Sequence, residues 1–118
     1  MSSSNAGQIL LALREVLEGG EWHPLSAFLS VCRARITPER ASRAWLHEEK
    51  YRLKRLKGYD PAADISEELD KTPYEERVTF GVRRLVSNTL SMAVMRGEVE
   101  RKKVEGVNHY RLTPATTA

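Results

Sequence analysis

The most regular pattern of apolar positions in this chain follows Thr72. Apolar or methyl-bearing side chains recur there at steps of three and four residues, the spacing that gathers them on one face of an α-helix. They are Val78, Val82, Leu85, Val86, Thr89, Leu90, Ala93 and Val94. Thr72 can cap this helix, Pro73 suits the first helical position, and Glu75 completes a capping box. Gly97 provides a left-handed C-cap, so the pattern predicts a long helix over residues 73–96.

The face opposite this apolar stripe is mostly polar. Its members are Arg77, Phe80, Arg84, Ser87, Asn88, Ser91 and Met95. Arginine and short polar side chains can reach base edges or phosphates in a DNA major groove. An ordinary solvated helix face has a similar composition, since outward polar faces are the rule. The helix alone therefore leaves both interpretations open.

The residues after this helix predict a β-hairpin over residues 98–113. Glu105-Gly106 makes a two-residue turn, in which Gly106 supplies the positive φ that such turns need. The turn pairs Val104 with Val107, Glu100 with Arg111 and Val99 with Leu112. Cations near the tip can lie along a phosphate backbone, and these are Arg101, Lys102 and Lys103. A charged edge hairpin that only avoids aggregation is the competing interpretation.

The N-terminal segment predicts two helices separated by a short extended stretch. Asn5 can cap a helix that closes at Gly19-Gly20. Its apolar side consists of Ile9, Leu10, Leu13, Val16 and Leu17. Residues 21–23 are extended, because Pro24 restricts the residue before it. Pro24 can then open the next helix, whose apolar positions are Leu25, Phe28, Leu29 and Cys32.

A further helix is predicted from Thr37-Pro38-Glu39, where a capping residue again precedes proline, to about Lys57 before Gly58. Cations follow one line along it at steps of three and four residues. We call this line the basic stripe, and its members are Arg40, Arg43, His47, Lys50, Lys54 and Lys57. A neighbouring face can dock the helix through Trp45, Leu46, Leu53 and Leu56, although Glu49 interrupts it.

The basic stripe has three interpretations. It can be a surface that contacts DNA phosphates, a surface for an acidic protein partner, or a solvated face without a partner. The acidic segment 60–70 can also fold against the stripe and mask it. Surface ion pairs of that kind are individually weak, worth about 0 to 1 kcal/mol. DNA would therefore displace such a segment at low salt.

Charge is segregated along the chain. Residues 1–57 hold ten Lys/Arg against six Asp/Glu, residues 58–76 hold one against seven, and residues 77–118 hold eight against three. Two basic blocks thus flank an acidic connector, within a net charge of +3 and a pI near 9.2. Basic surfaces of this kind suit a polyanionic partner.

Composition also indicates the class of protein. With 118 residues and 41% hydrophobic content, the chain is expected to form one domain. It has no apolar run of membrane-spanning length and no secretion signal, which predicts a cytoplasmic location and no membrane partner. The single cysteine, Cys32, cannot form an internal disulfide and is predicted to be a small buried hydrophobe.

The residues do not support catalysis. The chain has no glycine-rich phosphate loop, no paired metal-ligand spacing and no nucleophile with a local base. His23, His47 and His109 are scattered along the sequence. We therefore expect no enzyme activity, no metal and no cofactor.

The order of helix, short strand, helix, and later helix and hairpin resembles the winged helix-turn-helix family of bacterial and phage type. In that family the helix before the wing usually enters the major groove, and the wing contacts the adjacent backbone or minor groove. The resemblance implies a mainly α fold with a small β-hairpin (α+β). It rests on the extended stub 21–23, the helix 24–32, the helix 72–96 and the wing 97–113. The expected organisation is a single winged-helix domain over 5–113, with an insertion at about 37–71 and flexible tails at 1–4 and 114–118.

These features predict a duplex-DNA-binding protein that regulates transcription and associates with the nucleoid. Arg77, Arg84, Ser87, Asn88 and Ser91 are expected to contact bases. Arg101, Lys102 and Lys103 are expected to contact the backbone, and Arg40, Arg43, Lys50, Lys54 and Lys57 to extend the footprint. A homodimer could form through the apolar face of the first helix or of the 38–57 helix, because such regulators often bind two half-sites.

The main alternative is a winged-helix adaptor that binds a protein within a larger assembly. Phe80 and Met95 favour it, because apolar side chains on an exposed face often mark a protein contact. RNA binding is a weaker alternative, since only His109 and Tyr110 offer stacking on the wing.

Overall fold

The structure is a computed structural model that describes residues 5–56, 58, 65 and 69–114. Several sequence-based predictions lie outside the described residues. They concern the tail at 1–4, Lys57, most of the acidic segment 60–70, and residues 115–118 of the other tail.

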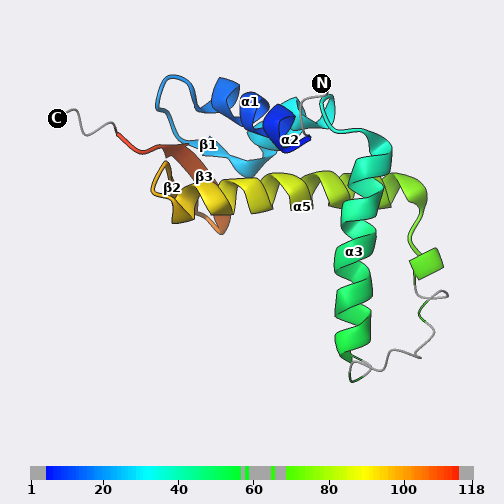
Figure 1. The fold of residues 1–118 in the computed structure, drawn as a ribbon. Helices are drawn as coiled ribbons and strands as arrows, with labels where there is room; N and C mark the ends of the chain where they lie inside the picture. The colour runs from blue at the N-terminus through cyan, green and yellow to red at the C-terminus, as the bar shows by residue number, and fades with distance from the viewer. Residues whose placement is uncertain (1–4, 57, 59–64, 66–68, 115–118) are drawn as a thin grey trace. The chain divides into compact units, whose positions relative to one another are not determined.

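The described residues form four helices and one antiparallel sheet of three strands (Figure 1). The helices are α1 (Asn5–Leu17), α2 (Leu25–Arg33), α3 (Pro38–Leu56) and α5 (Tyr74–Met95). The strands are β1 (His23–Pro24), β2 (Val99–Val104) and β3 (Val107–Leu112), in the sheet order β1-β3-β2. The predicted mainly α fold with a small β element is confirmed at this level.

Local chemistry explains where the helices begin. At α3 the Thr37 hydroxyl accepts the Arg40 backbone N–H at 3.2 Å, and Pro38 is the first helical residue, as predicted. α5 begins one residue later than predicted. The Pro73 carbonyl accepts the Arg77 N–H at 3.0 Å, so Pro73 precedes the first helical residue instead of occupying that position.

The chain forms two compact units, which are described separately. Unit 1 comprises Met1–Ile36 and Val86–Ala118, and unit 2 comprises Thr37–Leu85. α5 contributes its first part to unit 2 and its last part to unit 1. The segment predicted as an insertion, 37–71, therefore belongs to the same unit as the start of α5.

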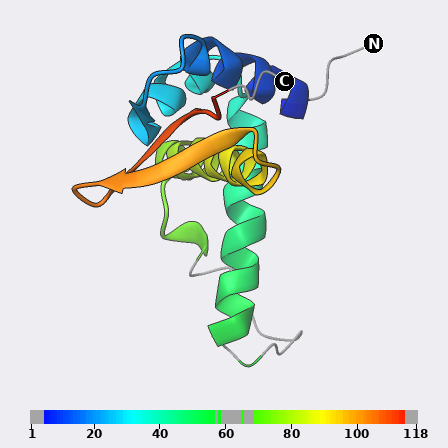
Figure 2. The same ribbon diagram turned by 90° about the vertical axis from the view of Figure 1, so that its left-hand side faces the viewer.

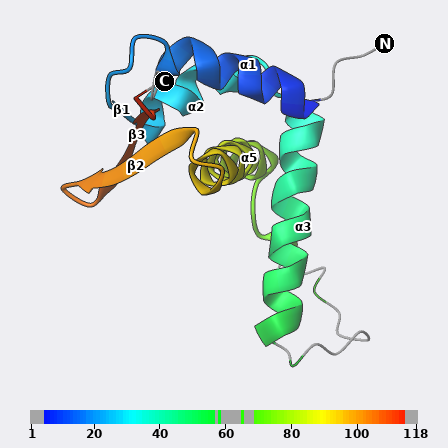
Figure 3. The ribbon, with the colours of Figure 1, turned by 60° about the vertical axis from the view of Figure 1, so that its left-hand side comes forward.

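Unit 1 has an apolar core made by α1, α2, the end of α5 and the sheet. α1 packs against α2, and both helices contact β3 (Figure 3). Phe28 is fully buried and meets His23 and Tyr110 edge-on, at ring-centroid distances of 6.3 and 5.8 Å. The other buried residues of this unit are Ile9, Ala12, Leu13, Leu17, Cys32, Ile36, Val86, Leu90, Ala93 and Val99. Most of these buried residues are therefore at the apolar positions that helical spacing predicted.

Cys32 lies in this core, as predicted. It is fully buried, and burial raises the pKa of its thiol from 9.0 to about 11. Because the thiol is protonated at neutral pH, Cys32 behaves as a small apolar residue.

Unit 2 is organised around Trp45 of α3. The buried cluster consists of Trp45, Leu53, Ile65 and Leu69, with the partly buried Leu46 against it. Ile65 and Leu69 come from the acidic segment, so its described apolar residues pack on the apolar face of α3. Leu56 was predicted to join that face, but it is 72% exposed because it is the last residue of the helix.

Within unit 2, α3 and α5 meet at a contact that requires glycine. A Cβ added to Gly81 would lie 1.7 Å from the Ala41 carbonyl oxygen, and both residues are buried. Any larger side chain at position 81 would overlap backbone atoms, which cannot rotate away. Gly81 therefore allows the two helix backbones to approach closely.

We predict that Gly81→Ala destabilises the protein by about 1–3 kcal/mol, the usual cost of overpacking a core. Urea denaturation measures the free energy of unfolding. Asn88→Ala, at an exposed position of the same helix, is the control, and it should leave stability within about 0.7 kcal/mol of the wild type. A Gly81→Ala protein as stable as the control would contradict the close crossing.

Candidate nucleic-acid interface

The last part of α5, in unit 1, presents a polar face. Asn88 is exposed, and Ser87 and Ser91 are half-buried. On the other side of the helix, Val86 and Leu90 are fully buried. Among the residues that the structure describes, the Asn88 side chain has no hydrogen-bond partner, so its amide is available to a ligand.

Two methionines extend this face. Met95, which the helical pattern placed there, is 80% exposed, and Met92 is 52% exposed. The face is therefore a mixture of small polar groups and flexible apolar side chains. It can make both hydrogen bonds and apolar contacts with a partner.

A closed turn at Gly97 joins α5 to the hairpin. Gly97 has a φ of +76°, and its N–H donates to the Val94 carbonyl at 3.0 Å. The Glu98 N–H donates to the Ala93 carbonyl, also at 3.0 Å. These two bonds make a Schellman motif, which satisfies carbonyls at the helix end. Because α5 ends at Met95 and β2 begins at Val99, only residues 96–98 lie between the helix and the hairpin.

The hairpin of β2 and β3 has the predicted register. Val104 pairs with Val107, Glu100 with Arg111, and Val99 with Leu112. Arg111 Nε donates to Glu100 Oε1 at 2.9 Å, which confirms the predicted opposite-charge pair. The turn has φ values of +51° at Glu105 and +82° at Gly106, as a type I′ turn requires. Figure 2 shows this turn at the free end of the hairpin, away from α1.

The three cations near the tip point to two different faces of the hairpin. All three are exposed, but side chains alternate along a strand. Arg101 and Lys103 therefore share one face, and Lys102 lies on the other. A phosphate strand that follows one face would meet Arg101 and Lys103 without Lys102.

Lys102 has a partner that the sequence pattern does not reveal. Its Nζ lies 4.4 Å from the centroid of the Trp22 ring, and Arg111 Cζ lies 4.6 Å from the same centroid. Both are cation–π distances. Trp22 immediately precedes β1, where His23 pairs with Tyr110 of β3. The missing information was the pairing of β1 with β3, which no local pattern reveals.

Arg77 stabilises unit 2 through internal contacts. Its guanidinium donates to the carbonyls of Thr72 and Leu69, at 2.7 and 3.0 Å, and lies 5.3 Å from the Trp45 ring centroid. Thr72, predicted as the helix cap, instead belongs to the turn that Arg77 holds. Because Nε and Nη2 both donate to backbone carbonyls and the guanidinium also lies against Trp45, Arg77 is held within unit 2, and we do not propose it as a base contact.

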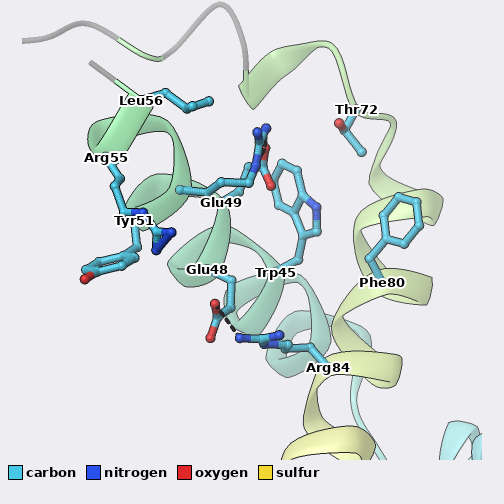
Figure 4. Close-up of a pocket in the computed structure, with 10 residues that line it drawn as sticks. Trp45, Glu48, Glu49, Tyr51, Arg55, Leu56, Thr72, Phe80 and Arg84 are labelled. Carbon is cyan, nitrogen blue, oxygen red and sulfur yellow. Dashed lines mark hydrogen bonds and ion pairs between the residues drawn. The ribbon is translucent and has the colours of Figure 1, made fainter. Parts of the chain in front are cut away.

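Arg84 also has a partner within unit 2. Its Nη2 lies 2.8 Å from Oε2 of Glu48 on α3, and the two side chains are 49% and 40% exposed. Figure 4 shows this pair among the residues that line a groove of about 740 Å³, together with Trp45 and Phe80. An ion pair with this exposure contributes about 0–1 kcal/mol, so a phosphate can compete with the carboxylate.

The basic stripe on α3 is shorter than predicted. Arg43, His47, Lys50 and Lys54 are exposed, and none has an ion-pair partner in the described part of the chain. Arg40 differs from them because it is half-buried, and its Nε is buried without a hydrogen-bond partner among the described residues. Successive members of the exposed stripe are about 4.5–6 Å apart along the helix axis.

No group of three or more His, Cys, Asp or Glu residues that could hold a metal ion occurs in the described residues. None of the helices in this part of the chain is both long and apolar enough to span a membrane. Comparisons with models of protein families, with curated proteins and with solved structures gave no match.

We predict that Gly97→Ala destabilises the protein by about 1–2 kcal/mol, the cost of a left-handed conformation at a non-glycine residue. No atom lies within 4 Å of a Cβ at this position, so the loss would reflect backbone strain and not a clash. Thermal unfolding measures it. Gly97→Asn should lose less, because asparagine tolerates the left-handed region. Equal stability of the wild type and Gly97→Ala would argue against the closed turn.

We predict that Arg77→Ala destabilises the protein by about 1–3 kcal/mol, because carbonyls of the turn before α5 lose their donors. The salt dependence of any binding to duplex DNA should stay at the wild-type value. Urea denaturation and a binding titration on the folded variant measure the two effects. A weaker salt dependence with unchanged stability would contradict this prediction and indicate that Arg77 contacts DNA.

Proposed function

We propose that this chain is a winged helix-turn-helix protein that binds duplex DNA. The order of elements supports this proposal: α1, β1, α2, then α5 running through Gly97 into the β2–β3 hairpin, with β1 paired to β3. The observation that carries it is the short junction at Gly97 between α5, with its polar face, and a hairpin that has exposed cations near its tip. In this proposal the last part of α5 lies in the major groove and the hairpin is the wing.

The base contacts belong to the polar face of α5 in unit 1. The Asn88 amide carries both a donor and an acceptor, so it can bond an adenine edge through two hydrogen bonds. Ser87 and Ser91 can donate to or accept from either kind of base. Met92 and Met95 supply apolar surface beside them. Asn88 is the residue on which sequence discrimination depends most.

The backbone contacts come from separate cationic surfaces. Arg101 and Lys103 lie on one face of the wing, where they can neutralise phosphates. In unit 2, Arg84 and the exposed part of the basic stripe provide further contacts that do not depend on sequence. The full protein then acts as a transcription regulator in the bacterial or phage-infected cell, and a homodimer would bind two half-sites.

A second candidate is a winged-helix adaptor whose partner is a protein. The exposure of Met92 and Met95 favours it, because two large apolar side chains lie close together on the α5 face. Binding to duplex DNA separates the two candidates, since an adaptor without a DNA contact would show no salt-dependent affinity.

We predict that the protein binds a labelled random-sequence duplex, with an affinity that falls as salt is raised. In fluorescence anisotropy, each phosphate contact should contribute about 0.9 to the slope of log affinity against log salt. Replacing Arg101 and Lys103 together by alanine should lower that slope by about 1.8. The charge-matched control replaces Arg33 and Lys71, which lie outside the proposed interface. Absence of binding at low salt would reject the DNA proposal and favour the adaptor.

We further predict that Asn88→Ala loses about 1–3 kcal/mol of affinity for a duplex selected from a random pool. Its affinity for a scrambled duplex should not change. The same titration on the two duplexes measures both values. Equal losses on the two duplexes would remove Asn88 from the base contacts.

A further inference from the structure

The outer face of the sheet carries a cluster of one aromatic and two cationic side chains. The strand register places Glu100, Lys102, His109 and Arg111 on one face of β2 and β3. Tyr110 is buried on the opposite face. Trp22 contacts the outer face, because both Lys102 and Arg111 lie against its ring. We call Trp22, Lys102 and Arg111 the tryptophan cluster.

The cluster holds two positive charges beside one indole. Lys102 Nζ is 4.4 Å and Arg111 Cζ is 4.6 Å from the Trp22 centroid. Arg111 uses its Nε on Glu100, which leaves its terminal nitrogens as donors. Lys102 has no carboxylate partner among the described residues. One carboxylate therefore faces two cations, and the cluster has a net positive charge that attracts anions.

The indole also limits the freedom of the lysine. A free lysine side chain samples many rotamers and must be ordered when it binds a ligand. Attraction to the face of Trp22 already holds Lys102 near the sheet and near Arg111. Part of the entropy that Lys102 would lose on binding is therefore already lost in the free protein. This strengthens binding without any additional contact.

The available groups fit a phosphate better than a base. Stacking of a base on Trp22 would have to displace cations that lie over the ring. Lysine and arginine instead offer several N–H donors to the oxygens of a phosphate. The exposed Val104 and Val107 continue this face toward the tip, where they offer no competing charge.

We propose that the tryptophan cluster is a binding site for a backbone phosphate of duplex DNA, in which Trp22 positions Lys102 and Arg111 for the contact. This inference rests on the proposed duplex binding. It adds a sequence-independent contact on the face of the wing opposite to Arg101 and Lys103. Trp22 acts through the two cations and is a positioning residue.

Binding titrations distinguish a direct phosphate contact by Lys102 from a positioning effect of Trp22. Lys102→Ala removes a phosphate contact, so the salt slope should fall by about 0.9 on selected and scrambled duplexes alike. Trp22→Leu keeps both cations but removes the ring that orders Lys102, so affinity should fall severalfold while the slope stays at the wild-type value. Trp22→Phe should recover most of the affinity, because phenylalanine also offers a ring face to cations. Lys71→Ala is the charge-matched control and should bind like the wild type.

The proposal is overturned if Lys102→Ala keeps the wild-type slope, or if Trp22→Leu binds as tightly as the wild type. Thermal unfolding establishes that each variant is folded. Should Trp22→Leu fail to fold, Trp22→Phe and Lys102→Ala decide the question. Trp22→Phe would then have to bind nearly as well as the wild type, and Lys102→Ala would have to show the reduced slope.

Fluorescence gives an independent readout. The chain has two tryptophans, so Trp45→Phe leaves Trp22 as the only indole. Adding a random-sequence duplex should change Trp22 emission in the same concentration range as the anisotropy, because the phosphate alters the cations around the ring. In this background Lys102→Ala should remove most of the change. Unchanged Trp22 emission at saturating duplex would contradict the site.

The two proposals can fail separately. If the unsubstituted protein binds no duplex at low salt, the proposed function fails, and the tryptophan cluster fails with it. If the protein binds with the expected salt dependence but Lys102→Ala changes neither slope nor Trp22 emission, only the tryptophan cluster is rejected.

Discussion

The left-handed Gly97 is the constraint on which the proposed interface depends. Its turn stops α5 through two backbone hydrogen bonds and passes the chain directly into β2. The return strand is fastened at the same place, because the Thr113 N–H donates to the Glu98 carbonyl at 3.1 Å and the Thr113 hydroxyl donates to the Gly97 carbonyl at 2.8 Å. Both ends of the hairpin are thus tied to the helix terminus. The polar face around Asn88 and the base of the hairpin are therefore held together within unit 1.

Features that depend on neighbouring residues could be predicted from the sequence. Thr37 and Pro38 begin α3 through a cap and a fixed φ, and Gly97 ends α5 by adopting a positive φ. The hairpin register also followed, because a two-residue turn leaves a single alignment that matches apolar and opposite-charge partners. In each case the deciding interaction spans few residues or is set by one turn.

Features that depend on partners far away in the sequence could not be predicted. Helical spacing places Arg84 on a polar face, but it does not reveal Glu48 as its partner. The alternation of side chains along an extended segment can place Trp22 and His23 on opposite faces. Only the pairing of β1 with β3, however, brings Trp22 to Lys102 and Arg111 of the hairpin. This long-range contact changes the composition of the candidate site. Cations that are adjacent in sequence divide between two faces of the hairpin, and Trp22, for which the sequence predicted no role, lies against one of them.

Nuclear magnetic resonance of the isotope-labelled protein, titrated with a duplex selected for binding, tests the central claim most directly. The account predicts that backbone amide signals shift along the exposed side of the last part of α5, at Asn88 and Ser91, and on the wing, at Arg101 and Lys103. Signals of α1 at Arg14 should stay in place. Shifts confined to α1, or no shifts at saturating duplex, would contradict the account.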